Sequence, residues 1–177
     1  MLIDSSSVSR TRIKICGFTR EQDIDVAATA GIDAAGFVLY APSPRAVSVQ
    51  RAAELARRLP SFITPVLLFV NADDALLHEA AQAMPHAVWQ FHGDETPDYC
   101  AQFARPWLRA ARVKPGLDLV EFAGSFPEAR GLLLDAFVEG YGGGGHVFDW
   151  TLIPPALPGH LILSGGLHAD NVAAAIE

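Results

Sequence analysis

The chain has 177 residues, half of them hydrophobic, and its 13 lysines and arginines against 20 aspartates and glutamates give a formal charge of −7. That length suits one domain with a substantial core, and the composition excludes a disordered or fibrous chain. With so few cations and no basic run, we expect no nucleic-acid partner, because such partners usually need a basic face. The longest aliphatic run, residues 66–70, is far shorter than the roughly 20 residues that cross a bilayer, so no membrane partner is expected.

The N-terminal residues and the two cysteines indicate where the domain begins and in which compartment the protein is expected. Residues 1–11 read as a loose leader, because Asp4 and a run of serines stand where a secretory signal would need a hydrophobic stretch. Cys16 and Cys100 form no CxxC motif and no dense framework, which favours a reducing cytoplasm. The remaining residues, 12–177, are expected to form one domain.

Short apolar runs alternate with helix-patterned segments along that domain, and glycine, proline, asparagine or aspartate marks each switch. The pattern predicts strands at 12–16, 34–39, 63–70, 87–91, 107–113, 130–135 and 160–164. It predicts helices at 19–30, 48–59, 73–84 and 96–104, and another from about residue 169 to the end. Thr19 with Gln22, and Ser48 ahead of Arg51, indicate N-caps for the first two helices.

The predicted strands are continuous hydrophobic runs, which is typical of strands buried on both faces and favours a parallel sheet covered by helices. Their starts repeat about every 25 residues, and eight such units would need roughly 200 residues, near the lower limit of a (βα)8 TIM barrel. We therefore expect a TIM barrel in which this chain supplies seven units and lacks the eighth. The alternative is an open sheet of seven strands.

In either architecture, functional side chains gather where the parallel strands end. Cys16 ends the first strand, with Lys14 on the same side of that strand by alternation, and Asp135 ends the sixth. Across a barrel mouth, a thiolate and a carboxylic acid on these two strands would form a general acid–base pair. The alternatives are an inert buried cysteine and an aspartate that caps the following loop.

Two glycine clusters and one arginine complete this rim. Backbone amides of residues 142–145, together with Gly165 and Gly166 before a helix, would suit a phosphate; alone, a glycine run is as often a flexible loop. Arg45, in a proline-stiffened loop, would capture a carboxylate, the alternative being a solvated surface arginine. His92 and Asp94 lack further ligands at a plausible spacing, so no metal site is expected.

These segments resemble the phosphoribosylanthranilate isomerase family of tryptophan biosynthesis. The resemblance rests on segments that run from the first strand to the seventh in family order: KICGFTR (14–20), AAGFV (34–38) with SPR (43–45), QFHGD (90–94), LLD (133–135), YGG and Gly145 (141–145), FDW (148–150) and LSGGL (163–167). The resemblance implies a (βα)8 barrel that catalyses an Amadori rearrangement of an aminoaldose phosphate without a redox or metal cofactor. The family's final strand, loop and helix have no counterpart in this chain.

The resemblance also implies roles for individual residues. Asp135 would be the general acid that opens the sugar ring, and Cys16 the thiolate base that removes the C2 proton. Arg45 would hold the anthranilate carboxylate and His92 would line the substrate site. The backbone of Gly143, Gly144, Gly145, Gly165 and Gly166 would bind the phosphate. The family usually has Ser or Thr at the position of Gly144 and Lys at that of His146, which implies weaker phosphate binding here.

Two other functions remain open from the sequence. The chain could be another barrel isomerase of phosphosugars with relaxed aromatic demands, or a catalytically silent module that binds phosphate or takes part in assembly. The sequence does not reveal the oligomeric state.

Overall fold

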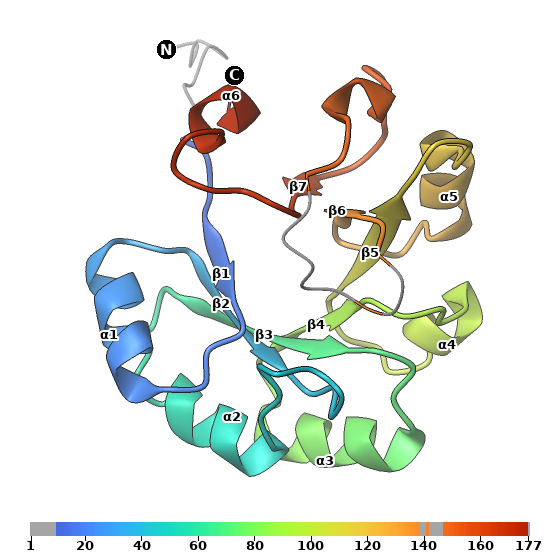
Figure 1. The fold of residues 1–177 in the computed structure, drawn as a ribbon. Helices are drawn as coiled ribbons and strands as arrows, with labels where there is room; N and C mark the ends of the chain where they lie inside the picture. Colours follow the sequence, from blue (N-terminus) through green and yellow to red (C-terminus); the bar gives the residue numbers. More distant parts are fainter. Residues whose placement is uncertain (1–9, 139–140, 142–146, 177) are drawn as a thin grey trace, which may run out of the picture.

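Seven short parallel strands form the framework of the domain. The computed structural model describes residues 10–138, 141 and 147–176 (Figure 1). Each of the seven predicted strands is present: β1 (Lys14–Cys16), β2 (Ala34–Val38), β3 (Thr64–Phe69), β4 (Val88–Phe91), β5 (Trp107–Val113), β6 (Leu132–Ala136) and β7 (Leu161–Leu163). The predicted leader lies almost wholly outside the described residues; the first described residue, Arg10, donates to the Asp33 carboxylate at 2.8 Å.

The helices follow the predicted alternation, with ends that differ from expectation. They are α1 (Glu21–Thr29), α2 (Val49–Ala56), α3 (Asp74–Ala83), α4 (Pro97–Ala101), α5 (Leu119–Ser125) and α6 (Val172–Ile176), with a 3₁₀ turn at Trp150–Leu152. Helix α5 was not predicted from the sequence. Its signal is Asp118, whose side chain accepts hydrogen bonds from the next turn's backbone, as an N-cap does. None of the described helices is long and apolar enough to span a membrane.

The two predicted N-caps have different outcomes. The Ser48 hydroxyl accepts from the backbone N–H of Arg51 at 3.1 Å, so that cap is confirmed. The cap at Thr19 is wrong, because α1 begins at Glu21 and its N-cap position is held by Arg20, which makes no side-chain cap bond. Helix α1 therefore begins too late for a Thr19 hydroxyl to reach its first free N–H groups.

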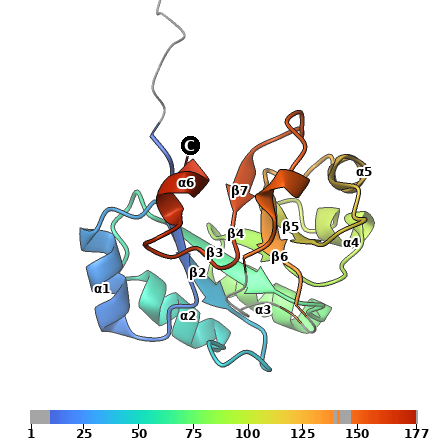
Figure 2. The same ribbon diagram turned by 45° about the horizontal axis from the view of Figure 1, so that its top comes forward.

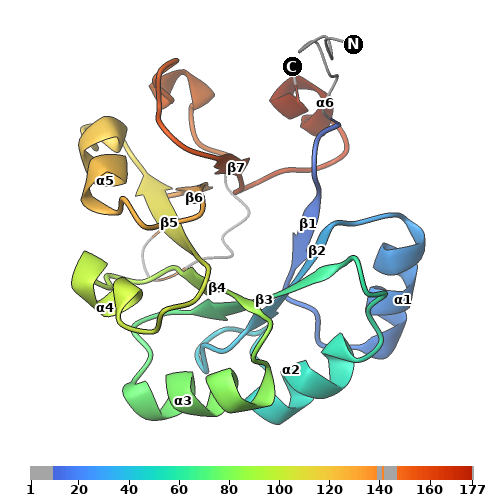
Figure 3. The ribbon, with the colours of Figure 1, turned by 180° about the vertical axis from the view of Figure 1, so that it is seen from behind.

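The strands pair in chain order from β1 to β7, and every pair is parallel. They curve into a TIM-barrel-like wall, as predicted, and α1 to α5 lie on its outside (Figures 1 and 3). No pairing between β7 and β1 occurs among the described residues, so β1 and β7 are its edge strands. Ile15 on β1 and Leu161 on β7 are accordingly 43% and 44% exposed. Helix α6 lies beside the start of β1 (Figure 2).

Aromatic side chains fill the space between β3, β4 and the helices. Phe69, Trp89 and Phe91 are fully buried, and the rings of Phe69 and Trp89 meet edge to face with centroids 5.1 Å apart. Such packing is well ordered because bulky rings leave few alternative rotamers and little free volume. The cluster therefore gives β4 a rigid backing directly before the residues that enter the candidate site.

A buried ion pair holds the loop that follows β4. Arg109 on β5 is 4% exposed, and its guanidinium lies 3.2 Å from the Glu95 carboxylate. The same guanidinium donates to the carbonyls of Phe91 and Gly93 at 3.0 and 2.9 Å, while Glu95 accepts from the Gly93 N–H at 2.9 Å. Burial lowers the pKa of Arg109, and the Glu95 charge opposes that shift. These bonds flank His92 and fix its backbone.

We expect Arg109→Met to lower the free energy of unfolding by about 3–5 kcal/mol, because it leaves the Glu95 carboxylate buried without its cation. Urea denaturation of the variant measures this. The matched control is Arg58→Met, which breaks an exposed ion pair. In that pair the side chain of Arg58 is 46% exposed and that of its partner Asp25 is 49% exposed. That change is expected to cost much less stability, because water and salt screen an exposed ion pair. Equal losses in the two variants would show that burial does not decide the effect.

Candidate active site

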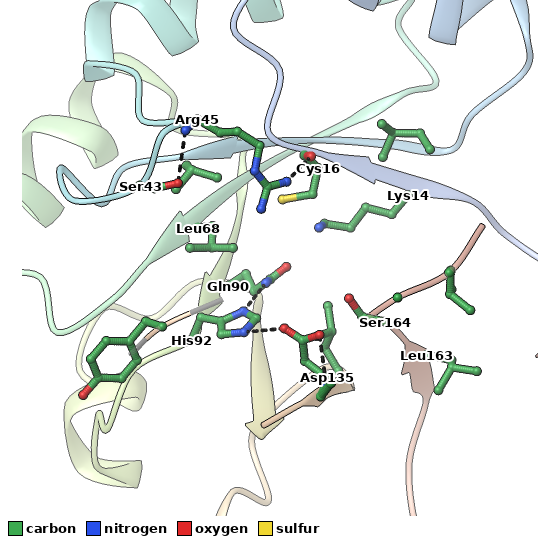
Figure 4. A pocket seen from close by; sticks show the side chains of 18 of the residues that line it. Lys14, Cys16, Ser43, Arg45, Leu68, Gln90, His92, Asp135, Leu163 and Ser164 are labelled. Carbon is green, nitrogen blue, oxygen red and sulfur yellow. Dashed lines mark hydrogen bonds and ion pairs between the residues drawn. The ribbon is translucent and has the colours of Figure 1, made fainter. Parts of the chain in front are cut away.

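One cavity of about 550 Å³ lies where the parallel strands end, and most of the predicted site residues line it. Its lining comes from β1, the loop after β2, β4, β6 and the segment after β7, so residues far apart in sequence meet there (Figure 4). The gathering of polar groups at this end of the strands is what a parallel sheet dictates.

The wall at β1 carries Cys16, and Lys14 faces the same cavity, as strand alternation predicted (Figure 4). Cys16 is a free thiol and is partly exposed. Its neighbour across the β1–β2 pair is Gly36, and a Cβ atom at Gly36 would lie 2.6 Å from the Cys16 sulfur. Glycine at this strand position therefore provides the space that the thiol occupies.

The opposite wall carries Asp135 and a chain of buried hydrogen bonds behind it. Asp135, on β6, is 8% exposed, and its Oδ2 lies 3.0 Å from His92 Nε2. His92 Nδ1 in turn lies 3.0 Å from the amide nitrogen of Gln90, on β4. The second carboxyl oxygen, Oδ1, accepts from the Ala136 N–H at 3.0 Å. The Asp135 carboxyl is thus oriented by two direct hydrogen bonds, and Gln90 holds the histidine that makes one of them.

Cys16 and Asp135 lie on β1 and β6 and line the same cavity from different sides, as the barrel arrangement predicted (Figure 4). The other cysteine, Cys100, lies in α4 and is 1% exposed. Burial raises the pKa of the Cys100 thiol to about 12, which keeps it in the unreactive thiol form at neutral pH.

Arg45 also lines the cavity, and its loop restrains it. Its backbone N–H donates to the Ser43 hydroxyl at 3.2 Å, and its guanidinium donates to the Cys16 carbonyl at 2.8 Å. Gly17, with φ +95°, lets the guanidinium lie close, since a Cβ there would stand 2.5 Å from the Arg45 side chain. The cation therefore lies beside the thiol strand, next to an apolar patch of Val38, Leu68 and Val70.

Only one of the two predicted glycine clusters falls within the described residues. Gly165 and Gly166 line the cavity with φ of +82° and +64°. A Cβ at Gly165 would lie 2.6 Å from Asp135 Oδ1, so this glycine also leaves room beside the acid. The helix expected directly after them begins only at Val172. Gly143, Gly144 and Gly145 lie outside the described residues.

Two residues of the site were missed by sequence reasoning, although each had a signal. Gly36 interrupts an apolar strand, which is typical of a close approach by another group. Gln90 is a polar residue in a buried strand and therefore needs hydrogen-bond partners. Asp94, considered with His92 as a metal ligand, is instead paired with Arg112 at 2.7 Å and accepts from the Tyr141 hydroxyl.

Comparisons with known proteins agree on one family. Residues 13–177 match the model described as N-(5'phosphoribosyl)anthranilate (PRA) isomerase. The N-(5'-phosphoribosyl)anthranilate isomerase of Dechloromonas aromatica (strain RCB) is 70% identical over 168 residues, which cover 95% of this chain and 81% of that protein.

Solved structures give the same answer for the fold. The phosphoribosyl anthranilate isomerase of Thermotoga maritima matches with a TM-score of 0.84 and 34% identity, over 94% of this chain and 82% of that one. A phosphoribosyl anthranilate isomerase in complex with reduced 1-(o-carboxyphenylamino)-1-deoxyribulose 5-phosphate matches with a TM-score of 0.81 and 32% identity, over 94% and 81% of the two chains.

We expect Gly165→Ala to reduce turnover strongly, because its methyl group would displace the Asp135 carboxyl and strain a backbone with positive φ. Steady-state kinetics on the folded variant measures this. The matched control is Gly124→Ala in α5, where a Cβ meets no atom within 4 Å. That variant should keep normal rates and gain up to about 1 kcal/mol of stability from better helix propensity. Normal turnover in Gly165→Ala would contradict the close approach.

Proposed function

The chain belongs to the N-(5'-phosphoribosyl)anthranilate isomerase family and is an isomerase of tryptophan biosynthesis, and we propose that Cys16 and Asp135 carry its proton transfers. The observation that supports this most is the presence of a free thiol and a buried carboxyl on separate walls of one cavity. Groups in such positions can act on two atoms of one bound sugar.

The proposed sequence begins with Asp135 as a protonated acid. It donates a proton to the ring oxygen of the aminoaldose, the C1–O bond breaks, and the nitrogen lone pair forms a Schiff base. The Cys16 thiolate then removes the proton from C2, and the C–H electrons move toward the iminium nitrogen to give an enolamine. Tautomerisation of the enolamine gives the aminoketose. The protons pass between the enzyme and the substrate, and the oxidation at C2 is balanced by the reduction at C1 of the same substrate molecule, so the proposed reaction requires no external oxidant or reductant and no metal cofactor.

The proposed substrate carries a carboxylate at one end and a phosphate at the other, and the cavity offers a partner for each. Arg45 would bind the carboxylate with its guanidinium fork, and the neighbouring patch of Val38 and Leu68 would pack against the aromatic ring. The backbone of Gly165 and Gly166, together with residues 143–145, would bind the phosphate. The charge of Lys14 in the cavity also favours an anionic ligand.

The enzyme is further proposed to work in the cytoplasm. The support is its place in amino-acid biosynthesis and its two free cysteines, of which Cys16 must stay reduced to act as a base.

We expect Cys16→Ala and Asp135→Asn each to lower kcat by at least about 10²- to 10⁴-fold, the usual contribution of one acid or base. Stopped assays of product formation and circular dichroism together measure the loss and show that the fold persists. The matched controls are Cys100→Ala, which changes a thiol outside the cavity, and Asp25→Asn, which changes an exposed carboxyl on α1. Near-normal turnover in either site variant would refute that residue's role.

Arg45→Met should raise KM for the carboxylated substrate by about tenfold or more, the usual range for a lost hydrogen bond to a charged group. For a substrate analogue with an unsubstituted aniline ring, the variant and the parent enzyme should have the same KM, since that ring has no carboxylate for Arg45 to bind. Measuring both substrates separates this family's reaction from that of a phosphosugar isomerase with relaxed aromatic demands. An equal loss on both substrates would contradict the carboxylate assignment.

A further inference from the structure

The hydrogen bonds behind Asp135 have a direction, and Gln90 sets it. We propose that Gln90 is a positioning residue that selects the ring nitrogen of His92 that carries the proton, and thereby selects the oxygen with which Asp135 acts as an acid. The inference rests on the proposed role of Asp135 as the acid, and deepens it.

The first step concerns the Gln90 amide. Its nitrogen lies 3.0 Å from His92 Nδ1, and an amide nitrogen can only donate a hydrogen bond. Nδ1 must therefore accept and carries no proton. In a neutral imidazole the proton then lies on Nε2, because one ring nitrogen donates while the other accepts.

The second step concerns the Asp135 carboxyl. His92 Nε2–H donates to Oδ2 at 3.0 Å, so this oxygen is an occupied acceptor that faces the protein. Oδ1 also accepts one hydrogen bond, from the Ala136 N–H at 3.0 Å, so the space beside each oxygen decides between them, and the proton that Asp135 transfers is placed on Oδ1. Beside Oδ1 the structure leaves space, since Gly165 lacks the side chain whose first atom would lie 2.6 Å away. Because His92 Nε2 already carries a proton, Asp135 cannot transfer its own proton to the imidazole and donates it toward the cavity.

The third step is that the Gln90 side chain, which lines the cavity, makes one hydrogen bond among the described residues, the bond to His92. It is 1% exposed, lies on β4 between Leu68 and Leu108 of the neighbouring strands, and its Oε1 has no hydrogen-bond partner among the described residues. A buried acceptor without a partner costs stability, and an apolar side chain of the same shape would avoid that cost. The benefit of glutamine therefore lies in the bond to His92.

The charged groups around the Gln90–His92–Asp135 hydrogen bonds come from several helices, strands and loops. The titratable and charged side chains that line the cavity with His92 and Asp135 are Lys14, Cys16, Tyr40, Arg45, Tyr141 and His168. Behind β4, the Arg109–Glu95 pair contacts the backbone on both sides of His92. A substitution at residue 90 changes none of these groups chemically, so a shift in the pH–rate profile is attributed to residue 90.

The test reverses that bond without changing its size. In Gln90→Glu a carboxylate replaces the amide, and because it only accepts, it requires a proton on His92 Nδ1. A buried carboxylate beside the ring favours the doubly protonated imidazolium, which favours the charged form of Asp135. Nitrogen-15 spectra of the imidazole rings, assigned by loss of the signal in His92→Gln, should show an Nε2–H tautomer in the parent enzyme and a protonated Nδ1 in the variant.

The kinetic expectation follows from the same reversal. We expect kcat of Gln90→Glu to fall about tenfold or more with little change in KM, and its decline with rising pH to begin at lower pH. Gln22→Glu, an exposed change on α1, is the matched control and should leave both parameters unaltered. An Nδ1–H tautomer in the parent enzyme, or an unaltered pH–rate profile in Gln90→Glu, would overturn the proposal.

A double-variant cycle separates positioning from mere support of the fold. Gln90→Met removes the bond, and His92→Gln keeps a partner for Asp135 but has no tautomers. If Gln90 acts through His92, Gln90→Met should lower kcat in the parent enzyme and add no more than about twofold in the His92→Gln background. Losses that multiply would contradict the inference.

Failure of the inference about Gln90 can be distinguished from failure of the proposed role of Asp135. If Asp135→Asn keeps its rate, the acid assignment fails. If Asp135→Asn is inactive while Gln90→Glu has normal turnover, only the inference about Gln90 fails.

Discussion

The arrangement of this protein depends on how a carboxyl group is kept at the end of an otherwise apolar strand. Burying Asp135 without partners would be costly, because the group would lose its bonds to water and gain none. The fold meets this demand with a neighbour two strands away: β4 delivers His92 to the same cavity, and the backbone of Ala136 supplies a second donor. The parallel strand order makes this meeting unavoidable, because β4, β5 and β6 all end at one rim.

The histidine itself is held by a second layer of polar contacts. Aromatic packing behind β4 and the buried Arg109–Glu95 pair fix the backbone around His92, while Gln90 fixes the ring. A buried ion pair of this kind is weak support for overall stability, since desolvation offsets most of the attraction. Its effect is local: it ties β4, β5 and the loop after β4 into one arrangement, which leaves the imidazole a single orientation.

Space is the other requirement of the site, and glycine provides it on both walls. Gly36 leaves room for the Cys16 thiol, Gly17 for the Arg45 side chain, and Gly165 for the Asp135 carboxyl. Each of these three side chains therefore stands against a backbone without a Cβ atom. This close approach lets a cavity of moderate size hold a thiol, a guanidinium and a carboxyl while its centre remains open for a ligand.

The sequence by itself determined that there are seven strands, that they form a parallel sheet, and that Cys16, Arg45, His92 and Asp135 lie at one rim of it. Hydrophobic periodicity and apolar runs identify helices and strands, and in a parallel sheet the functional groups gather at the C-terminal ends of the strands. The sequence contained the Asp118 cap of helix α5, but this signal was missed. The start of α1 could not be read locally, because a long-range bond from Arg51 holds the Thr19 carbonyl ahead of the helix. Only the tertiary structure decided that His92 binds Asp135, that Gln90 orients His92 and that Gly36 borders the thiol. Those pairings join residues of different strands or depend on side-chain direction, and strand spacing along the chain carries no information about either.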